Sequence, residues 1–245
     1  MNATFNTTEP IIEIKDLKKS YRDNHVLKGF NVSLYERENL VIMGKSGSGK
    51  SVMIKCLFGL GEPDSISIMF MGKKVCELKH WKLDELRTKI GFLFQGSALY
   101  DSMSVRENLE FPLRRHSKKF GVIKDATVLI TEALENVGLA DAIDLVPSKL
   151  SGGMKRRIAL ARTLILRPKI ILCDEPPSGL DSITSKEIIL LMMSFQKKYN
   201  TSSISIKNDF DCARVISNRM ILIIDNNQLC RRNFCRTFWL RRPKN

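Results

Sequence analysis

The residues best suited to chemistry lie in a glycine-rich segment, Gly44–Ser51, which reads Gly-Lys-Ser-Gly-Ser-Gly-Lys-Ser. It follows a short apolar run, Leu40–Met43, that predicts a buried strand, and it precedes a predicted helix, Ser51–Phe58. Glycines at this spacing let successive backbone N–H groups face one anion, and the helix N-terminus adds the positive end of its dipole. Lys50 offers a mobile charge to β- and γ-phosphates, and the Ser51 hydroxyl can ligate Mg²⁺. The segment therefore predicts nucleoside triphosphate binding.

A second group of candidate residues follows the apolar run Ile170–Cys173, which predicts another buried strand. Asp174 stands at the carboxyl end of that strand, where a carboxylate can bind Mg²⁺ directly or through water. Glu175 comes next and can polarise an attacking water. An acidic pair after four apolar residues is by itself weak evidence for a catalytic metal site. The phosphate-binding segment in the same chain strengthens this interpretation.

A third segment, Leu150–Met154, precedes a predicted basic helix, Lys155–Leu166. Its serine and two glycines at a helix start predict a second anion-binding N-terminus. The segment resembles the LSGGQ signature of the ATP-binding cassette (ABC) ATPase family, with Met154 at the position of the glutamine. In that family two subunits pair head to tail, and each ATP is clamped between the phosphate loop of one and the signature of the other.

This resemblance covers roughly residues 10–225, and it implies an α/β fold with a P-loop NTPase (RecA-like) core. It also implies an N-terminal antiparallel β subdomain and an inserted α-helical subdomain at about 96–165, within a domain of residues 1–225. The residues that it assigns to ATP are Tyr21 (stacked on adenine), Gly44, Lys45, Ser46, Gly47, Ser48, Gly49, Lys50, Ser51, Val52, Ser151, Gly152 and Gly153. Those assigned to Mg²⁺ are Ser51, Gln95 and Asp174, and those assigned to catalysis are Glu175, Gln95 and Asn208.

Two further segments, Phe94–Val105 and Glu107–Leu113, narrow the resemblance. Together with Leu150–Arg157 they look like the ATPase subunit of the Mla-type transporters, which move phospholipid between the membranes of diderm bacteria. The implied partners are a second copy of this chain and an integral membrane permease, with phospholipid as the indirect substrate. Gln95 and the segment up to Met103 would then pass motion to the permease.

The chain departs from the family pattern near the chemistry. Asn208 stands where the family has a histidine that contacts the γ-phosphate, Lys207 replaces a small hydroxyl residue, and Pro177 replaces a threonine. An asparagine amide can donate a hydrogen bond but cannot carry a charge. If one transition-state contact is lost, hydrolysis slows about 10²–10³-fold, as for the loss of an oxyanion donor. We therefore expect ATP binding with slow hydrolysis.

The net charge of +14 is concentrated partly in residues 226–245, which hold six basic residues and no acidic one. This atypical tail reads either as a frameshifted or decayed reading frame or as a segment for a membrane surface, because Phe234, Phe238, Trp239 and Leu240 lie among its arginines. The remaining excess is ordinary for a protein that binds ATP and docks at a membrane.

The location expected from the sequence is the cytoplasm, with peripheral attachment to the cytoplasmic face of the inner membrane. No apolar run is long enough for a membrane span, and the first residues lack the features of a signal peptide. Two other functions stay open. A soluble ABC ATPase acting on nucleic acid would suit the basic charge, but the second cassette or zinc module usual there is missing, so no nucleic acid is expected. A hydrolysis-impaired paralogue would suit Asn208, Pro177 and the tail.

Overall fold

The computed structural model describes residues 9–78, 80–94, 96–116, 124–174, 182–207, 210–224 and 227–231. The chain divides into a first unit, Met1–Leu78 with Ser202–Asn245, and a second unit, Lys79–Thr201. Among the described residues, no helix is both long and apolar enough to cross a membrane. The predicted boundaries, a helical subdomain at about 96–165 and a tail from 226, stay predictions.

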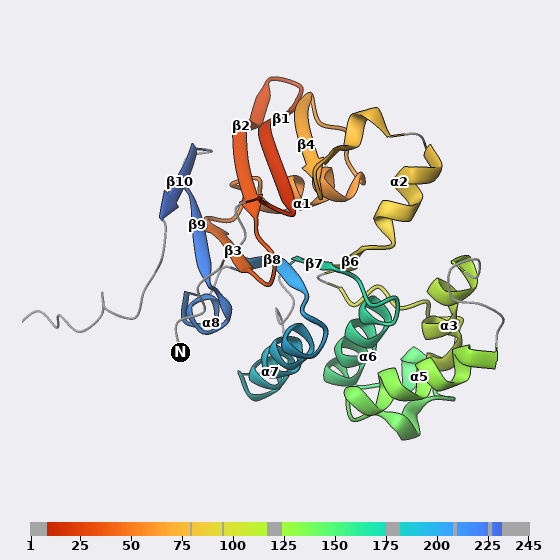
Figure 1. Ribbon diagram of the computed structural model, residues 1–245. Helices are drawn as coiled ribbons and strands as arrows, with labels where there is room; N and C mark the ends of the chain where they lie inside the picture. The colour runs from red at the N-terminus through yellow and green to blue at the C-terminus, as the bar shows by residue number, and fades with distance from the viewer. Residues whose placement is uncertain are drawn as a thin grey trace, which may run out of the picture. The chain divides into compact units, whose positions relative to one another are not determined.

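An antiparallel sheet forms the N-terminal part of the first unit, with the strand order β2-β1-β4-β5 (Figure 1). Its strands are β1 (Ile12–Tyr21), β2 (Asn24–Leu34), β4 (Ser65–Phe70) and β5 (Lys73–Lys74). The apolar alternation at the start of β1 stops after Ile14. A register shift between Ile14 and Leu17 returns Leu17 to the buried side, so β1 continues through the charged residues.

The first unit also contains a mainly parallel set of strands in the order β10-β9-β3-β8. These are β3 (Asn39–Gly44), β8 (Ser202–Lys207), β9 (Arg219–Ile224) and β10 (Asn227–Arg231). β3 pairs in parallel with both β8 and β9, and its residues Leu40–Met43 are all buried, as expected for a strand covered on both faces. β10 pairs antiparallel with β9, so part of the segment predicted as a tail adds a strand. Residues 232–245 lie outside the described residues.

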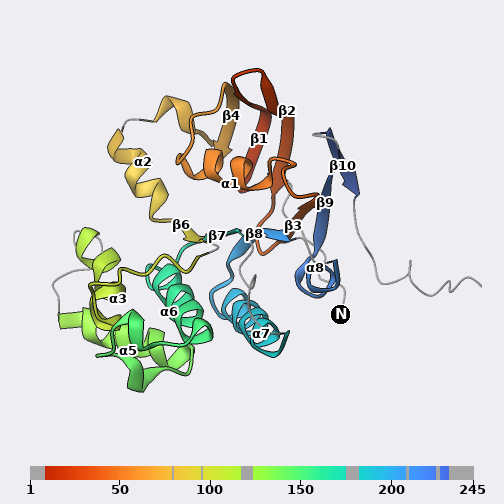
Figure 2. The same ribbon diagram turned by 180° about the vertical axis from the view of Figure 1, so that it is seen from behind.

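The second unit is mostly helical and also holds the parallel pair β6 (Ile90–Leu93) and β7 (Ile170–Asp174) (Figure 2). Its main helices are α3 (Val105–Arg115), α5 (Lys124–Asn136), α6 (Gly152–Leu164) and α7 (Ser182–Tyr199). α3, α5 and α6 pack against one another, with Leu109, Leu134 and Ile158 fully buried between them. The predicted α/β class, with an antiparallel sheet near the N-terminus and a parallel sheet carrying the glycine-rich segment, is confirmed.

Two short helices were not predicted: α2 (His80–Arg87) in the second unit and α8 (Phe210–Ile216) in the first. They have eight and seven residues, too few to show an apolar period. α1 (Lys50–Phe58) begins one residue before its predicted start, directly after the last glycine of the glycine-rich segment, Gly49. The prediction from sequence was therefore most reliable where a long periodic pattern or a glycine marked the boundary.

A largely buried ion pair joins distant parts of the first unit. Arg219, at the start of β9, donates from Nε and Nη2 to the two carboxylate oxygens of Glu38, at 2.6 and 3.0 Å. Nη2 also donates to the backbone oxygen of Ser33. The Glu38 carboxylate accepts from the Tyr35 amide at 2.8 Å, and the backbone oxygen of Glu38 accepts from the Ser203 amide. This pair therefore ties the ends of β2, β3, β8 and β9 together.

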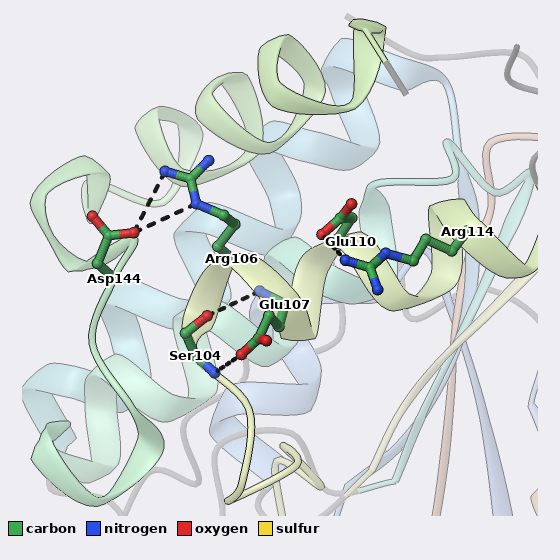
Figure 3. A network of polar contacts seen from close by, with 6 residues as sticks. All are labelled: Ser104, Arg106, Glu107, Glu110, Arg114 and Asp144. Atoms are coloured by element: carbon green, nitrogen blue, oxygen red, sulfur yellow. Dashed lines mark hydrogen bonds and ion pairs between the residues drawn. The ribbon is translucent and has the colours of Figure 1, made fainter. Parts of the chain in front are cut away.

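The start of α3 is held by a capping box (Figure 3). The Glu107 amide donates to the Ser104 hydroxyl at 3.2 Å, and the Ser104 amide donates to the Glu107 carboxylate at 2.7 Å. The backbone hydrogen bond from Ser104, followed by the bond from its side chain, holds the pKa of Glu107 below its ordinary value of 4.5. The carboxylate also lies at the positive end of the helix dipole.

This cap predicts a pH-dependent stability difference for Glu107→Gln. Glutamine keeps the acceptor but loses the charge, so we expect the variant to unfold at a lower temperature at pH 7. Because the folded-state pKa of Glu107 is lowered, the carboxylate stabilises the fold fully above 4.5, and this contribution is lost as the pH falls through the lowered pKa. Thermal unfolding of both proteins over a pH series from 7 downward tests this, with the exposed Glu62→Gln as control. A difference that stays constant over the whole series contradicts it.

Candidate functional site

The glycine-rich segment leads from β3 to α1 in the first unit and forms a tight loop. Gly47 and Gly49 have φ angles of +81° and +87°, in the left-handed region where side chains are strained. A Cβ on Gly49 would lie 2.9 Å from Cγ1 of Val26 and 3.0 Å from Cδ2 of Leu27. Gly49 is also the N-cap of α1, so the N-terminus of this helix lies at the loop. The backbone can take this course only with glycine at these positions.

The Lys50 side chain folds back across the loop. Its Nζ donates to the backbone oxygen of Gly44 at 2.7 Å and to that of Lys45 at 2.8 Å, and the residue is only 5% exposed. An ammonium group held this way lies over the concave side of a loop whose amides can face an anion. The helix N-terminus supplies further positive potential there.

Two details of the loop fit the phosphates of a nucleotide. The Ser48 hydroxyl is buried and has no hydrogen-bond partner among the described residues, which leaves a donor available to a phosphate oxygen. A Cβ on Gly44 would lie 2.7 Å from that hydroxyl and 2.8 Å from the backbone oxygen of Ile223, so a side chain there would close the loop. The loop therefore combines a cation, an unused buried donor and close backbone approach, which is the donor set that a triphosphate needs.

The two described candidates for Mg²⁺ are Ser51 and Asp174. Ser51 is half-buried in the first turn of α1, in the first unit. Asp174 is the last residue of β7, in the second unit, and is 8% exposed. A hydroxyl and a carboxylate are oxygen ligands of the kind Mg²⁺ takes, alongside waters and phosphate oxygens. Among the described residues there is no group of three or more acidic, histidine or cysteine side chains that could hold a metal without a nucleotide.

The signature segment starts α6 in the second unit. Ser151 is the N-cap, and its hydroxyl accepts from the Met154 amide at 3.2 Å. Ser151 and Gly152 are exposed, so the first amides of the helix are open to an anion from outside. A Cβ on Gly153 would lie 2.9 Å from Cγ2 of Thr184 in α7, which explains why a residue without a side chain stands there.

Tyr21 ends β1 and is 54% exposed, with the Lys19 ammonium 5.1 Å from the centre of its ring. It pairs with Asn24 across the hairpin. Two residues further along β2, Val26 contacts the position of Gly49 in the phosphate loop. The hairpin that carries Tyr21 is thus packed against the phosphate loop within one unit, and the aromatic face stays available for stacking.

Several predicted site residues lie outside the described residues: Gln95, Glu175 and Asn208, together with Pro177. Lys207 is described. It ends β8, is 3% exposed and pairs with Met43, the residue before Gly44. It therefore lies at the same edge of the parallel strands as the phosphate loop.

Two residues that hold the loop after β6 were not predicted from the sequence: Asn108 in α3 and Arg162 in α6. Asn108 is fully buried and bonds to the loop that follows β6, and Arg162 donates to the same loop. The signal in the sequence for Asn108 is a polar residue among apolar residues at helical spacing, Val105, Leu109 and Leu113. Arg162 gave no signal among its many basic neighbours, because its partners lie more than fifty residues away in sequence.

The sequence is related to those of known proteins. A family model described as ABC transporter matches residues 27–178. The chain is 37% identical over 211 residues to the probable ribonucleotide transport ATP-binding protein mkl of Mycobacterium leprae (strain TN), covering 85% of this chain and 60% of that protein. It is 36% identical over 213 residues to the methionine import ATP-binding protein MetN of Clostridium tetani (strain Massachusetts / E88), covering 87% and 66%. The chain thus spans no more than about two thirds of these curated relatives.

Solved structures agree in fold. The dimeric ATP-binding cassette MJ0796, in a post-hydrolysis state bound to ADP and Pi, matches with a TM-score of 0.80 and 30% identity, over 91% of this chain and 100% of that one. CbiO1 of Clostridium perfringens, part of the ABC transporter complex cbiONQ, matches with a TM-score of 0.79 and 27% identity, over 90% and 87%. With the phosphate loop of β3 and α1 and the signature at the start of α6, the chain belongs to the ABC transporter family.

Proposed function

We propose that this chain is the ATP-binding subunit of an ABC transporter and couples ATP binding and hydrolysis to a separate membrane permease. The observation that carries the proposal is the phosphate loop, in which Lys50 donates to the Gly44 and Lys45 carbonyls, beside a Ser48 hydroxyl that has no hydrogen-bond partner in the described part of the chain. The chain would act at the cytoplasmic face of the inner membrane, attached through the permease.

The roles follow from the chemistry of each side chain. Loop residues Gly44 to Val52 hold the phosphates, Tyr21 stacks on the adenine, and Ser51 and Asp174 provide oxygen ligands for Mg²⁺ with Gln95. Glu175 polarises the attacking water, because a carboxylate next to the metal site can accept its proton. When bound, MgATP supplies the γ-phosphate and the metal charge that these residues position.

A second copy of the chain completes the site in this proposal. Ser151, Gly152 and Gly153 form an exposed helix N-terminus, which suits an anion brought by another molecule. The related cassette MJ0796 is described as dimeric, which supports a homodimer here. Size measurement with and without ATP and Mg²⁺ tests this, and a monomer under both conditions contradicts it.

We propose phospholipid as the transported substrate, on the resemblance of Phe94–Val105 and Leu150–Arg157 to Mla-type subunits. The relatives named for ribonucleotide transport and methionine import offer the two competing substrates. The test is ATP turnover by the chain co-purified with its permease and placed in phospholipid vesicles, compared with detergent. Stimulation by vesicles supports the proposal. If only added methionine or ribonucleotide stimulates turnover, the proposal of phospholipid as substrate is wrong. The proposal that the chain is the ATP-binding subunit of a transporter then still stands.

The substitution at the switch position predicts slow turnover. Asn208 cannot provide the charged or tautomeric contact of a histidine, so we expect Asn208→His to raise the turnover number by at least about tenfold, with little change in ATP affinity. Steady-state phosphate release by both proteins at saturating ATP measures this. Equal rates would show that Asn208 does not limit hydrolysis. If both proteins release phosphate at a negligible rate, the result favours the alternative of a hydrolysis-impaired paralogue, which Pro177 also favours.

A further inference from the structure

The loop of residues 96–104, between β6 and α3, is held in an unusual backbone conformation. Ser97 and Ala98 both have left-handed φ angles, +61° and +50°, although neither is glycine. Such residues are strained and persist only where surrounding contacts hold them. Tyr100, in the same loop, is 43% exposed and packs on the ring of Phe111 of α3 with 5.0 Å between ring centres. The loop therefore presents a fixed shape at the surface of the second unit.

Arg162 of α6 holds the strained half of the loop. Its Nη2 donates to the backbone oxygen of Ala98 at 2.8 Å and to that of Ser97 at 3.3 Å. Its Nη1 reaches Oδ1 of Asn108 at 3.4 Å, and its guanidinium carbon lies 5.7 Å from the centre of the Tyr100 ring. The planar fork of arginine can satisfy carbonyls and an amide oxygen at once, which lysine cannot do.

Asn108 of α3 holds the other half. Its Nδ2 lies 3.0 to 3.1 Å from the backbone oxygens of Tyr100, Met103 and Ser104, which share its two N–H donors. Its Oδ1 accepts from the Tyr100 amide at 2.8 Å. The side chain is fully buried, so each of these bonds is shielded from water and costly to leave unmade.

The start of α3 is also bonded to the segment that leads into the signature. The Val105 amide donates to the Leu145 oxygen and the Arg106 amide to the Ile143 oxygen, both at 2.8 Å. The Arg106 guanidinium adds a contact of 3.4 Å to Asp144 (Figure 3). The 96–104 loop is therefore connected to residues before Ser151 and, through Arg162, to the helix that Ser151 caps.

We propose that Arg162 is a positioning residue that makes the 96–104 loop move with the signature helix α6, so that nucleotide bound at Ser151 is sensed at the loop. The inference rests on the proposed function, in which Ser151 contacts the ATP of a second copy. Ser151 and Arg162 stand on one helix eleven residues apart, about 16 Å at the rise of an α-helix. A continuous helix carries a displacement over that length, and the bonds to Ser97 and Ala98 pass it to the loop.

The test is hydrogen–deuterium exchange of the backbone amides of residues 97–104 in the full chain, with and without the non-hydrolysable analogue AMP-PNP and Mg²⁺. In the unmodified protein we expect the nucleotide to change the exchange rate of these amides by at least about threefold. In Arg162→Met, which keeps a side chain of similar length, this change should disappear. The dissociation constant for AMP-PNP should stay within about threefold, because Arg162 is outside the nucleotide site.

Two further variants separate coupling from simple loss of structure. Arg115→Met removes an exposed arginine at the end of α3 and should keep the full nucleotide response. Arg162→Lys can satisfy only part of the bonds and should give an intermediate response, and it replaces Arg162→Met if that variant does not fold. A full response in Arg162→Met, or in Arg162→Lys where that variant stands in, overturns the proposal. So does an unmodified protein that binds AMP-PNP without any response at residues 97–104. Failure to bind AMP-PNP contradicts the proposed function instead.

Discussion

Replacing Lys50 with methionine is expected to lower ATP turnover by at least about 10²–10³-fold, the effect of removing one charge-stabilising donor from a transition state. Methionine has a similar length but no ammonium, so the bonds to the Gly44 and Lys45 carbonyls are lost along with the charge offered to the phosphates. ATP affinity should fall as well, because the buried ammonium lies where the β- and γ-phosphates would bind. Phosphate release and equilibrium nucleotide binding measure the two effects.

The matched control for this prediction is Lys55→Met. Lys55 stands in the last turn of the same helix, is exposed and lies away from the loop. Its replacement removes the same charge from the chain and should leave both turnover and affinity unchanged. Equal losses in the two variants would mean that net charge, and not the position of Lys50, governs nucleotide binding. An unaffected Lys50→Met would contradict the site itself.

The second large effect is expected on stability, in Glu38→Ala. Removing this carboxylate leaves the guanidinium of Arg219 largely buried without its partner, which typically costs about 3–5 kcal/mol. The Tyr35 amide also loses its acceptor. Because the pair joins β3 to β9, we expect the free energy of unfolding of the first unit to fall by this amount. Urea unfolding followed by circular dichroism measures it.

Two comparisons make the stability test specific. Glu36→Ala removes an exposed carboxylate two residues away and should change the free energy of unfolding by less than about 0.5 kcal/mol. Adding Arg219→Met to Glu38→Ala removes the unpaired charge and should recover part of the loss. If Arg219→Met lowers the free energy of unfolding as much in the Glu38→Ala background as in the unmodified protein, the two side chains do not act as a pair.

The phosphate loop could be predicted in detail because all its determinants are local. The apolar run, the glycines, the lysine and the start of α1 follow one another within about twenty residues, and each has one strong conformational preference. The same holds for β7 with Asp174 and for Ser151 at the start of α6. The full length of β1 could not be predicted for the opposite reason, since the register shift after Ile14 depends on pairing with β2 and β4.

By itself the sequence determined the phosphate loop with the strand and helix that flank it, the strand that ends at Asp174, the signature N-cap and the family. Only the tertiary structure decided that Arg162 of α6 holds the loop after β6, that Asn108 closes it, and that Glu38 pairs with a residue 181 positions away. Local elements follow from backbone preferences and apolar periodicity, which depend on residues close together in the sequence. Polar contacts between distant segments depend on which surfaces the packing of the fold brings together. Periodicity along the chain does not predict those contacts.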